Sequence, residues 1–484
     1  MLRVVFFRLA YDRIYTLYKD NVPEKRDVRP PEGLLYPAAM ALAEGHIVNV
    51  VDGHAEYLTP DEVVEKVVAL KPDVVGCGAT TPEFPHESET LRSIKQRTGC
   101  ITVVGGPHVS AIPAETLCDN PHIDYVIRNE GEYTLRDLLR VIESKGSARG
   151  VNGLAYREDG RPILTPPRPP IANLDDLPPP AWHLAPMDKY YFADPHSGIR
   201  KMASVITSRG CPFNCIFCFS MHGKRIRCRS PKLVVDEIAN LKKRYGIEYI
   251  FFHDETLTFD KVRTLTMLQD IIDRQLNIEW TCMTRADSLD EEVVAKMAES
   301  GCTRASLGIE SGNQKILDTA RKHSDRPTLR RAYQLLQKYG IEGRGSLILG
   351  LPGETRDTIG ETIEFVKTLD VKVAAFNIVT PYPGTVLYDM AKAGKGIQLM
   401  SADWKDYRRW GNAVARTDEL SPADLIYWQK RATVEFYTQP KLIRYYLKKW
   451  VTLRHGEYYL RPFKNALRQR LRSALKGDFK LKHL

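Results

Sequence analysis

The sequence contains no apolar run long enough to cross a membrane. A spanning helix needs about 20 consecutive apolar residues, whereas the stretch 34–43 is short and contains Pro37. The amino terminus, MLRVVFFRLAYDRIY, has neither a long apolar core nor a small-residue cleavage site, so it predicts a first β-strand rather than a signal peptide. These absences argue against an integral membrane protein and against a secreted one.

Cysteine is also scarce. The 484 residues include nine cysteines, an odd number without the spacing of a disulfide framework, which favours a reducing, cytoplasmic compartment. Excess positive charge is confined to the end of the chain: residues 440–484 hold 13 Lys and Arg against 2 Asp and Glu, and the rest is close to neutral. Because the chain lacks a uniformly basic face, we expect no specific nucleic-acid partner.

The first 150 residues alternate strand and helix patterns. Apolar runs rich in β-branched residues occur at 4–7, 47–51, 74–77, 101–104 and 125–127. Continuous apolar strands separated by helices are typical of a parallel sheet that is covered on both faces. Residues 1–150 are therefore predicted to form a doubly wound, Rossmann-like α/β domain whose ligand lies at the carboxyl ends of the strands.

A second β/α series follows a proline-rich stretch. Nine prolines between Arg161 and Tyr190 predict an extended linker, which we place at residues 151–196. Candidate strands at 203–206, 249–252, 279–282, 304–309, 345–349 and 373–379 predict a partial (β/α)6, TIM-like barrel over residues 197–390. Residues 391–484 are predicted to form a helical, basic carboxyl-terminal region.

Three cysteines lie close together after the first strand of the second series. Cys211, Cys215 and Cys218 have the spacing C-x-x-x-C-x-x-C. Three thiolates from one short loop can bind three irons of a cubane 4Fe-4S cluster, which leaves the fourth iron free for another ligand. A zinc site is the alternative, and it would take His222 or Cys228 as its fourth ligand.

Further motifs accompany the cysteine loop. They are Arg229-Ser230-Pro231 with Asp236-Glu237, Phe252-His253-Asp254-Glu255-Thr256, Arg285-Ala286-Asp287, Gly308-Ile309-Glu310-Ser311-Gly312, Gly350-Leu351-Pro352-Gly353-Glu354-Thr355 and Pro381-Tyr382-Pro383-Gly384-Thr385. With the cysteine loop and the domain order, they make residues 1 to about 390 resemble the radical S-adenosylmethionine enzymes that carry an amino-terminal cobalamin-binding domain. This branch includes the anaerobic magnesium-protoporphyrin monomethyl ester cyclase. The resemblance implies that the open iron binds S-adenosylmethionine, and that an electron from the cluster yields a 5′-deoxyadenosyl radical that abstracts hydrogen from an unactivated carbon.

The resemblance also implies which residues contact S-adenosylmethionine. Glu310 and Ser311 would face it, and Arg285 could grip its carboxylate; a buried structural ion pair is the alternative for Glu310 and Arg285. The Gly-Gly-Glu run that many members use for the methionine amino group is absent from this sequence. Asp254 and Glu255 are therefore the candidates for that contact.

Family members place cobalamin over the strand ends of the first domain. The matching positions here are Thr80, Thr81, Gly105, Gly106, Pro107, His108, Glu130, Gly131 and Glu132. Glycine lets the backbone approach a bulky ligand, and the helix after Gly106 offers free N–H groups. The alternatives are a domain without cofactor and a nucleotide-binding domain, although no GxGxxG follows the first strand. Asp52-Gly53-His54 imitates a known cobalamin motif but follows the second strand, so we interpret His54 as a loop histidine rather than a cobalt ligand.

The main hypothesis is an oxygen-sensitive, cytoplasmic enzyme that uses a 4Fe-4S cluster, S-adenosylmethionine and cobalamin to transfer a methyl group to an unreactive carbon. One alternative is a radical cyclisation or rearrangement of a tetrapyrrole or lipid-type substrate, and another is a non-catalytic cobalamin or metal sensor. The catalytic residue is unknown. His253 is a candidate for a proton or substrate contact, and solvation at a strand end is its alternative.

The expected partners follow from the chemistry and from the tail. They are a small-molecule or lipid-like substrate and an electron donor such as flavodoxin or ferredoxin. Residues 441–476 interleave leucine and aromatic residues with Lys and Arg at helical spacing. This stretch predicts either a helical cap on the barrel or peripheral contact with the inner face of the membrane, with RNA contact as a third alternative.

Overall fold

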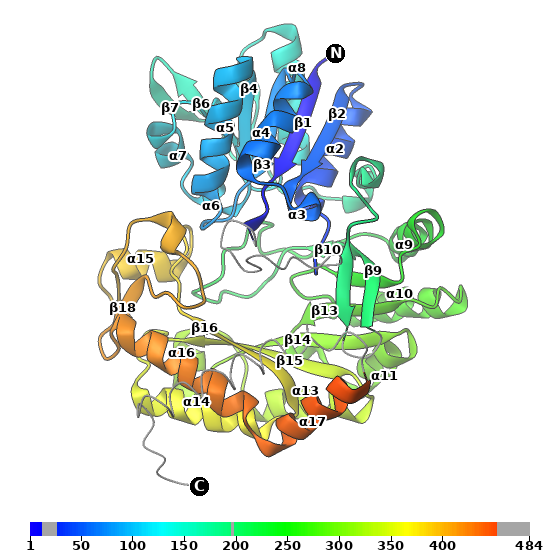
Figure 1. The fold of residues 1–484 in the computed structure, drawn as a ribbon, viewed down its shortest axis with the longest axis vertical. Coiled ribbons are helices and arrows are strands. Elements are labelled where there is room, and N and C mark those ends of the chain that lie inside the picture. Colours follow the sequence, from blue (N-terminus) through cyan, green and yellow to red (C-terminus); the bar gives the residue numbers. More distant parts are fainter. Residues whose placement is uncertain (12–26, 195–197, 453–484) are drawn as a thin grey trace.

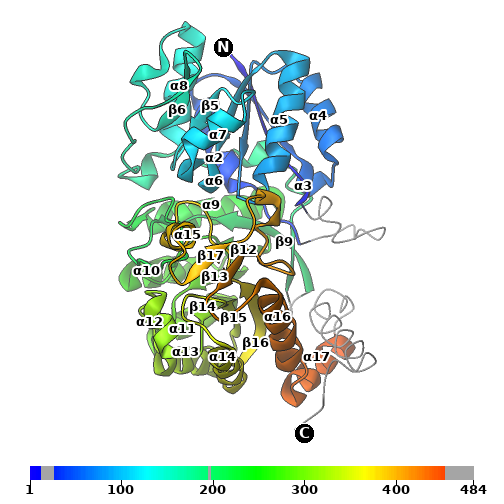
Figure 2. The same ribbon diagram turned by 90° about the vertical axis from the view of Figure 1, so that its left-hand side faces the viewer.

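The structure, a computed structural model, describes residues 1–11, 27–194 and 198–452. Within these residues it forms two lobes, each built on a seven-stranded sheet and stacked along the long axis of the molecule (Figure 1). The upper lobe contains the amino-terminal sheet. The lower lobe contains the second sheet together with helices α16 (Pro422–Tyr437) and α17 (Pro440–Thr452), and the view from the side shows the same stacking (Figure 2).

The upper sheet has the strand order β2-β1-β3-β4-β5-β6-β7. The first five strands are parallel: β1 (Arg3–Arg8), β2 (Ile47–Asp52), β3 (Val74–Gly78), β4 (Ile101–Gly105) and β5 (Tyr125–Ile127). Side chains alternate between two buried faces, because Val5 and Phe7 belong to one apolar cluster, and Val4 and Phe6 to another. The predicted sheet with two covered faces is therefore confirmed.

Helices cover both faces of the upper sheet. Helices α4 (Pro60–Ala69), α5 (Phe84–Thr98) and α7 (Pro113–Asp119) contribute to the cluster that contains Val5. Helices α2 (Glu32–Ala43) and α8 (Glu132–Ser144) contribute to the opposite cluster. The short helices α3 (Gly53–Glu56) and α6 (Pro107–Ala111) follow β2 and β4, at the carboxyl edge that faces the lower lobe (Figure 1).

The upper sheet continues past residue 150, where the proline content predicts a linker. Strand β6 (Leu154–Glu158) pairs antiparallel with β5 and with β7 (Arg161–Leu164). Asp159 and Gly160 join β6 to β7 with φ of 49° and 74°, the positive values that a two-residue hairpin turn requires. Pro162 is tolerated because β7 is an edge strand. The chain then includes the 3-10 turns η2 (Leu174–Asp176) and η3 (Trp182–Leu184) before it enters the lower lobe.

The lower sheet has the order β16-β15-β14-β13-β12-β9-β8. Its six parallel strands are β9 (Gly198–Val205), β12 (Tyr249–Phe252), β13 (Glu279–Thr284), β14 (Cys302–Glu310), β15 (Glu342–Leu349) and β16 (Val371–Ile378). Strand β8 (Tyr191–Asp194) adds an antiparallel edge beside β9. Because β8 and β16 lie at opposite edges of the sheet, the barrel is partial, as predicted.

Helices pack on the outer face of the lower sheet, and the core includes the fully buried Trp280 of β13. They are α9 (Pro231–Tyr245), α10 (Lys261–Asp273), α11 (Glu291–Glu299), α12 (Gln314–Thr319), α13 (Arg326–Lys338) and α14 (Arg356–Thr368). The carboxyl ends of the strands of the lower sheet face the upper lobe (Figure 1).

The carboxyl-terminal region begins with α15 (Val386–Lys392) and the antiparallel pair β17 (Ile397–Leu399) and β18 (Ala415–Thr417), with η5 (Trp404–Asp406) between them. Helix α17 packs on the barrel, where the buried Tyr446 donates a hydrogen bond to the carbonyl of Lys372 (2.8 Å). The remainder of the predicted basic tail, residues 453–484, lies outside the described residues. Across the part of the chain that is described, no helix has both the length and the apolar character to span a membrane.

Candidate functional site

The three clustered cysteines lie on the loop that joins β10 (Ser208–Arg209) to β11 (Arg227–Cys228), two short strands that pair antiparallel. Backbone hydrogen bonds hold this cysteine loop in the lower lobe. Ile216 donates its N–H to the carbonyl of Ala320 (3.1 Å), and its own carbonyl accepts from the N–H of Leu387 (2.9 Å). Cys211 and Cys215 are half-buried and Cys218 is exposed, so the scaffold orders the thiols while a ligand can still reach them.

The three thiols are close enough to influence one another electrostatically. Although Cys218 is exposed at the surface, partial desolvation by the surrounding loop, and then the neighbouring thiols of Cys215 and Cys211, raise its pKa to about 11. His222, considered above as a fourth zinc ligand, is instead hydrogen-bonded through Nδ1 to Oε1 of Glu255 (2.8 Å). No three His, Cys, Asp or Glu side chains of the described residues converge as ligands of a single ion. Three neighbouring thiols are a donor set that fits a cubane cluster with one iron left without a protein ligand.

Arg285, directly after β13, is held by the protein through Nε and one of its two terminal nitrogens. Its guanidinium carbon lies 3.5 Å from the ring centroid of Phe213, a residue of the cysteine loop. Its nitrogens donate to Asp287 (2.9 and 2.7 Å) and to the carbonyls of Lys322 and His323 (both 3.0 Å). This set of contacts corresponds to the structural alternative, in which Arg285 positions the loop. A direct contact between Arg285 and S-adenosylmethionine stays a prediction.

Glu310, at the end of β14, forms a buried ion pair with Lys322, whose Nζ lies 2.9 Å from Oε1 of Glu310. A Cβ atom at Gly308 would lie 2.6 Å from that Nζ and would also collide with the Glu310 carboxylate, so only glycine leaves room for the pair. Burial opposes the charge of Lys322, but Glu310 and then Cys215 raise its pKa. The pair therefore brings one positive and one negative group beside the cysteine loop.

Asp254 and Glu255 brace the start of the cysteine loop. Asp254 is fully buried and accepts a hydrogen bond from the hydroxyl of Ser208 (2.8 Å); burial raises its pKa. Glu255 accepts from the N–H of Gly210 (3.0 Å). Burial works to raise the pKa of Glu255, but the hydrogen bond with His222 lowers it overall. These contacts orient the loop, and the contact with the methionine amino group stays a prediction.

Two other predicted residues also have protein partners. Ser311 is fully buried, and its hydroxyl is hydrogen-bonded to that of Thr362 on α14 (3.0 Å). His253 lies at the end of β12 with 45% of its side chain exposed, and its Nδ1 is 3.6 Å from Oε1 of Glu32 in the upper lobe. Burial works to lower the pKa of His253, but the Glu32 carboxylate raises it above its ordinary value. Its part in proton transfer stays a prediction.

Glu130 and Glu132, predicted to contact cobalamin, bind two arginines of the lower lobe. The two Glu130 oxygens accept from the two terminal nitrogens of Arg227 (2.8 Å each), and Glu132 accepts from Arg209 (2.6 Å). All four side chains are buried, with exposures of 5 to 6%. Arg209 and Arg227 belong to β10 and β11 and thus flank the cysteine loop. We call these four residues the interlobe clamp, because they tie the loop to the upper sheet.

The other predicted cobalamin positions lie at the carboxyl edge of the upper sheet. Gly105 ends β4, Pro107 begins α6, Gly131 precedes α8, and Thr80 follows β3 and donates to Glu83 (2.5 Å). Gly106 has φ of +100°, and a Cβ there would lie 2.7 Å from both N and O of Ala79. Glycine is therefore needed for the turn after β4 to pack directly against the backbone that follows β3, and this edge presents bare backbone at Gly106.

His108 adds a polar atom to the same edge. It is fully buried, with Nδ1 hydrogen-bonded to the hydroxyl of Thr81 (3.2 Å) and Nε2 buried without a partner. Burial lowers the pKa of His108 to about 4, so the imidazole is neutral. A bare backbone and an unpaired, neutral nitrogen fit a large ligand that carries amide groups, which is the chemistry of cobalamin.

The Asp52-Gly53-His54 segment has a structural explanation. The Asp52 carboxylate caps α3 by accepting from the N–H groups of His54 (3.0 Å) and Ala55 (3.1 Å). It also accepts from Arg8 (2.7 Å) and from the hydroxyl of Tyr190 (2.7 Å). The aspartate therefore ties the upper sheet to the linker, and its likeness to a cobalamin motif follows from its role as a helix cap.

Three residues of the site were absent from the sequence-based prediction: Lys322, Arg209 and Arg227. The two arginines flank the cysteine loop, and a cation next to a group of thiols is a signal that could have indicated them. Lys322 lies twelve residues after Glu310 on another segment, so no strand or helix period links the two.

Comparison with known proteins agrees with this architecture. Residues 205–366 match the Radical SAM superfamily, and residues 26–139 match the B12 binding domain. The fold and the site thus define a radical S-adenosylmethionine protein with an amino-terminal cobalamin-binding domain.

Individual relatives narrow the assignment. The chain is 36% identical over 443 residues to an uncharacterized methyltransferase of Pyrococcus horikoshii, covering 91% of this chain and 94% of that protein. It is 31% identical to the anaerobic magnesium-protoporphyrin IX monomethyl ester cyclase of Rubrivivax gelatinosus, covering 82% and 72%. The solved methyltransferase TsrM from Kitasatospora setae, with cobalamin and a [4Fe-4S] cluster bound, aligns with a TM-score of 0.69 at 18% identity over 91% and 90% of the two chains. The chain belongs to the cobalamin-dependent radical S-adenosylmethionine enzymes, as its motifs predict.

Proposed function

We propose that this enzyme is a methyltransferase that transfers a methyl group to an unreactive carbon of a small molecule. The observation that carries the proposal is the interlobe clamp, which ties the loop of Cys211, Cys215 and Cys218 to the sheet that matches the B12 binding domain. A reaction that uses two cofactors on one substrate needs both held at a constant separation, because misplacement of reacting groups is costly.

When bound, the cluster supplies the electron that cleaves S-adenosylmethionine, and cobalamin carries the methyl group. The residues of the chain bind and orient these groups. Lys322 offers its ammonium to the carboxylate of S-adenosylmethionine, and Glu310 accepts a hydrogen bond from a ribose hydroxyl. Arg285 holds Phe213 and thereby the cysteine loop. Lys322 and Glu310 would each exchange the other for one part of S-adenosylmethionine, so neither buried charge would be left unpaired.

In the upper lobe, Gly106 and His108 form the edge that receives cobalamin. Glycine at Gly106 lets this turn pack closely against the Ala79 backbone, and the two backbone segments together would form the face that the macrocycle covers. The neutral His108 presents Nε2 as the polar atom that an amide side chain of cobalamin can satisfy. Thr81 orients the imidazole from its other nitrogen.

Methyl transfer is favoured over cyclisation by the relatives. The Pyrococcus horikoshii protein, a methyltransferase by name, is similar over nearly the whole of both chains. The cyclases of Rubrivivax gelatinosus and Synechocystis, at 31% and 30% identity, favour a radical cyclisation as the second candidate. The two functions share their cofactors and differ in whether the product gains a carbon atom.

The same proposal includes the partners. The substrate is a small molecule, and a flavodoxin or ferredoxin in the cytoplasm supplies the electron. For the tail, the buried Leu442 and Tyr446 support the helical cap over a membrane contact in the part that is described.

Anaerobic reconstitution with iron, sulfide and hydroxocobalamin tests the function. The reduced holoenzyme should contain about four irons per chain and should form 5′-deoxyadenosine from S-adenosylmethionine. Cys215→Ala should abolish this cleavage, whereas Cys118→Ala, an exposed cysteine outside the loop, should retain it. With methyl-labelled S-adenosylmethionine and a small-molecule extract, a labelled product supports methyl transfer. An unlabelled product supports cyclisation, and a colourless protein with a single zinc contradicts both.

A further inference from the structure

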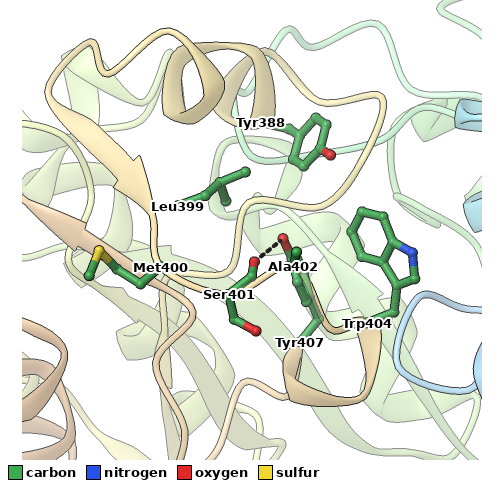
Figure 3. A pocket seen from close by; sticks show the side chains of 7 residues that line it. All are labelled: Tyr388, Leu399, Met400, Ser401, Ala402, Trp404 and Tyr407. Carbon is green, nitrogen blue, oxygen red and sulfur yellow. Dashed lines mark hydrogen bonds between the residues drawn. The ribbon is translucent and has the colours of Figure 1, made fainter.

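A cavity of about 320 Å³ lies in the carboxyl-terminal region, outside the residues discussed so far. It is lined by Tyr388, Leu399, Met400, Ser401, Ala402, Trp404 and Tyr407 (Figure 3). Three aromatic rings form much of its wall: the ring centroids of Trp404 and Tyr407 are 4.8 Å apart, and those of Tyr388 and Trp404 are 6.4 Å apart. We call this cavity the aromatic pocket.

The polar side chains of the aromatic pocket are neutral, and two of them, Tyr407 and Ser401, are hydrogen-bonded within the chain. The Tyr407 hydroxyl donates to the carbonyl of Ser401 (3.1 Å), and the Ser401 hydroxyl donates to Asp406 (2.8 Å). Burial raises the pKa of Tyr388, and none of the seven lining residues is charged. A pocket of this kind binds through apolar and aromatic contact rather than through ion pairs.

The aromatic pocket lies where the two lobes meet. Trp404 packs edge-on against His108 of the upper lobe, with ring centroids 5.1 Å apart. Tyr388 belongs to α15, which follows the loop containing Gly384. At Gly384 there is no room for a side chain, because a Cβ would lie 2.7 Å from the ring of Phe219 and 2.8 Å from Ala111 of the upper lobe. Phe219 directly follows Cys218, so the turn that leads into α15 contacts the cysteine loop, while Trp404 of the pocket wall contacts the proposed cobalamin edge.

We propose that the aromatic pocket binds a flat aromatic portion of the substrate, about the size of two fused rings. The proposal rests on the proposed function and adds the substrate class to it. Two fused rings match a volume at the lower end of small-molecule sites, and offset or edge-on contact with three rings favours an aromatic occupant over a saturated one. Because Trp404 packs on His108, an occupant held by Trp404 lies near that histidine and next to the proposed meeting point of the two cofactors.

The test uses the reconstituted holoenzyme and two probes with the same carbon skeleton, 2-naphthol and its saturated form, decahydro-2-naphthol. Equilibrium dialysis should show that 2-naphthol binds about tenfold more tightly, since aromatic ring pairs are favourable beyond the area that they bury. Trp404→Ala should weaken the binding of 2-naphthol about tenfold, and Trp404→Phe should restore most of it. Trp410→Ala is the matched control, because Trp410 is 51% exposed and does not line the pocket.

Equal binding of the two probes, or equal binding by Trp404→Ala and the Trp410 control, would overturn the proposal. Thermal unfolding and the cobalamin absorbance of each variant show whether the variant is folded. If Trp404→Ala does not fold, Tyr388→Leu provides a second variant. The proposal for the aromatic pocket and the proposal of methyl transfer can be disproved separately. Binding of 2-naphthol that depends on Trp404, in an enzyme that forms no 5′-deoxyadenosine, would support the pocket and remove the proposed function.

Discussion

The two lobes present the carboxyl ends of parallel strands to each other (Figure 1). They differ in how the charged side chains at these ends are paired or neutralised. On the lower side, charged groups beside the cysteine loop are paired: Lys322 with Glu310, both buried, and Arg285 with the half-buried Asp287. On the upper side, the buried Asp52 forms an ion pair with Arg8, but burial favours the neutral forms of His108 and Glu87. Burial lowers the pKa of His108 to about 4, while burial and then Glu83 raise that of Glu87.

The difference corresponds to the ligands that the two edges are proposed to hold. A zwitterion such as S-adenosylmethionine can replace each half of an existing ion pair, so opposite charges are kept together in a buried site. A large macrocycle with amide side chains brings few charges, and it suits neutral hydrogen-bonding groups such as His108 and a bare backbone at Gly106. The comparison teaches that two edges of similar topology can differ in the groups beside the proposed ligand: a buried ion pair at Lys322 and Glu310, and a neutral imidazole at His108.

Breaking the interlobe clamp should have the largest effect on the comparison, because it separates the two edges. Arg227→Met leaves the Glu130 carboxylate buried without its bidentate partner, and the free energy of unfolding should fall by about 3–5 kcal/mol in urea titrations. Arg149→Met, which breaks an exposed bidentate pair with Glu158, is the matched control and should change stability little. Similar losses for the two variants would show that the clamp contributes no more than a surface pair.

The lower edge is tested at Lys322. Lys322→Met removes the positive half of the buried pair, and the Kd for S-adenosylmethionine should rise about 30- to 100-fold in equilibrium dialysis. Lys322→Arg keeps the charge and should bind more tightly than the methionine variant. Lys338→Met, which breaks an exposed pair with Glu291, should leave the Kd unchanged. If the Kd of Lys322→Met stays within about twofold of the original, the pair is purely structural.

The upper edge is tested at Gly106. Gly106→Ala places a methyl group 2.7 Å from the Ala79 backbone at φ of +100°, and it should weaken cobalamin binding about tenfold. The measurement is the cobalamin retained per chain after gel filtration. Gly99→Ala is a matched control, since Gly99 also has positive φ (+67°) but has no atom within 4 Å of the added methyl group. Equal retention by both variants would contradict a ligand at this edge.

Glu354 sharpens the comparison, because it is a buried acid of the lower lobe that has no cationic partner. Burial raises its pKa to about 8, and its hydrogen bonds from the N–H groups of Gly350 and Leu351 only partly oppose this. The folded state then holds a proton that the unfolded state releases near pH 4.5. The stability from this group is therefore present at low pH and is lost as the pH rises toward 8, by about 1.4 kcal/mol per unit. Glu354→Gln should remove this slope from urea titrations between pH 6 and 8, and an unchanged slope would contradict a protonated Glu354.

Much of the fold was predictable from sequence, because continuous apolar runs mark buried parallel strands. The six barrel strands and the first five strands of the upper sheet occur where these runs lie. The hairpin of β6 and β7 was missed because its strands are short and β7 contains Pro162, although Asp159-Gly160 was a turn signal that the prolines obscured. At the site, the cysteines were predicted from local spacing. Lys322 was not predicted, because a lysine that is far from its partner in the sequence is most often a solvated side chain.

By itself, the sequence determined which segments become strands and that three thiols share one short loop, because both depend on residues near each other in the chain. Only the tertiary structure decided which charges are paired. Glu130 lies 97 residues from Arg227 and Glu132 lies 77 from Arg209, and the protonation of Glu87, His108 and Glu354 depends on the packing around them. The physical reason is that ion pairing and desolvation depend on distance and burial in space, which no local pattern encodes.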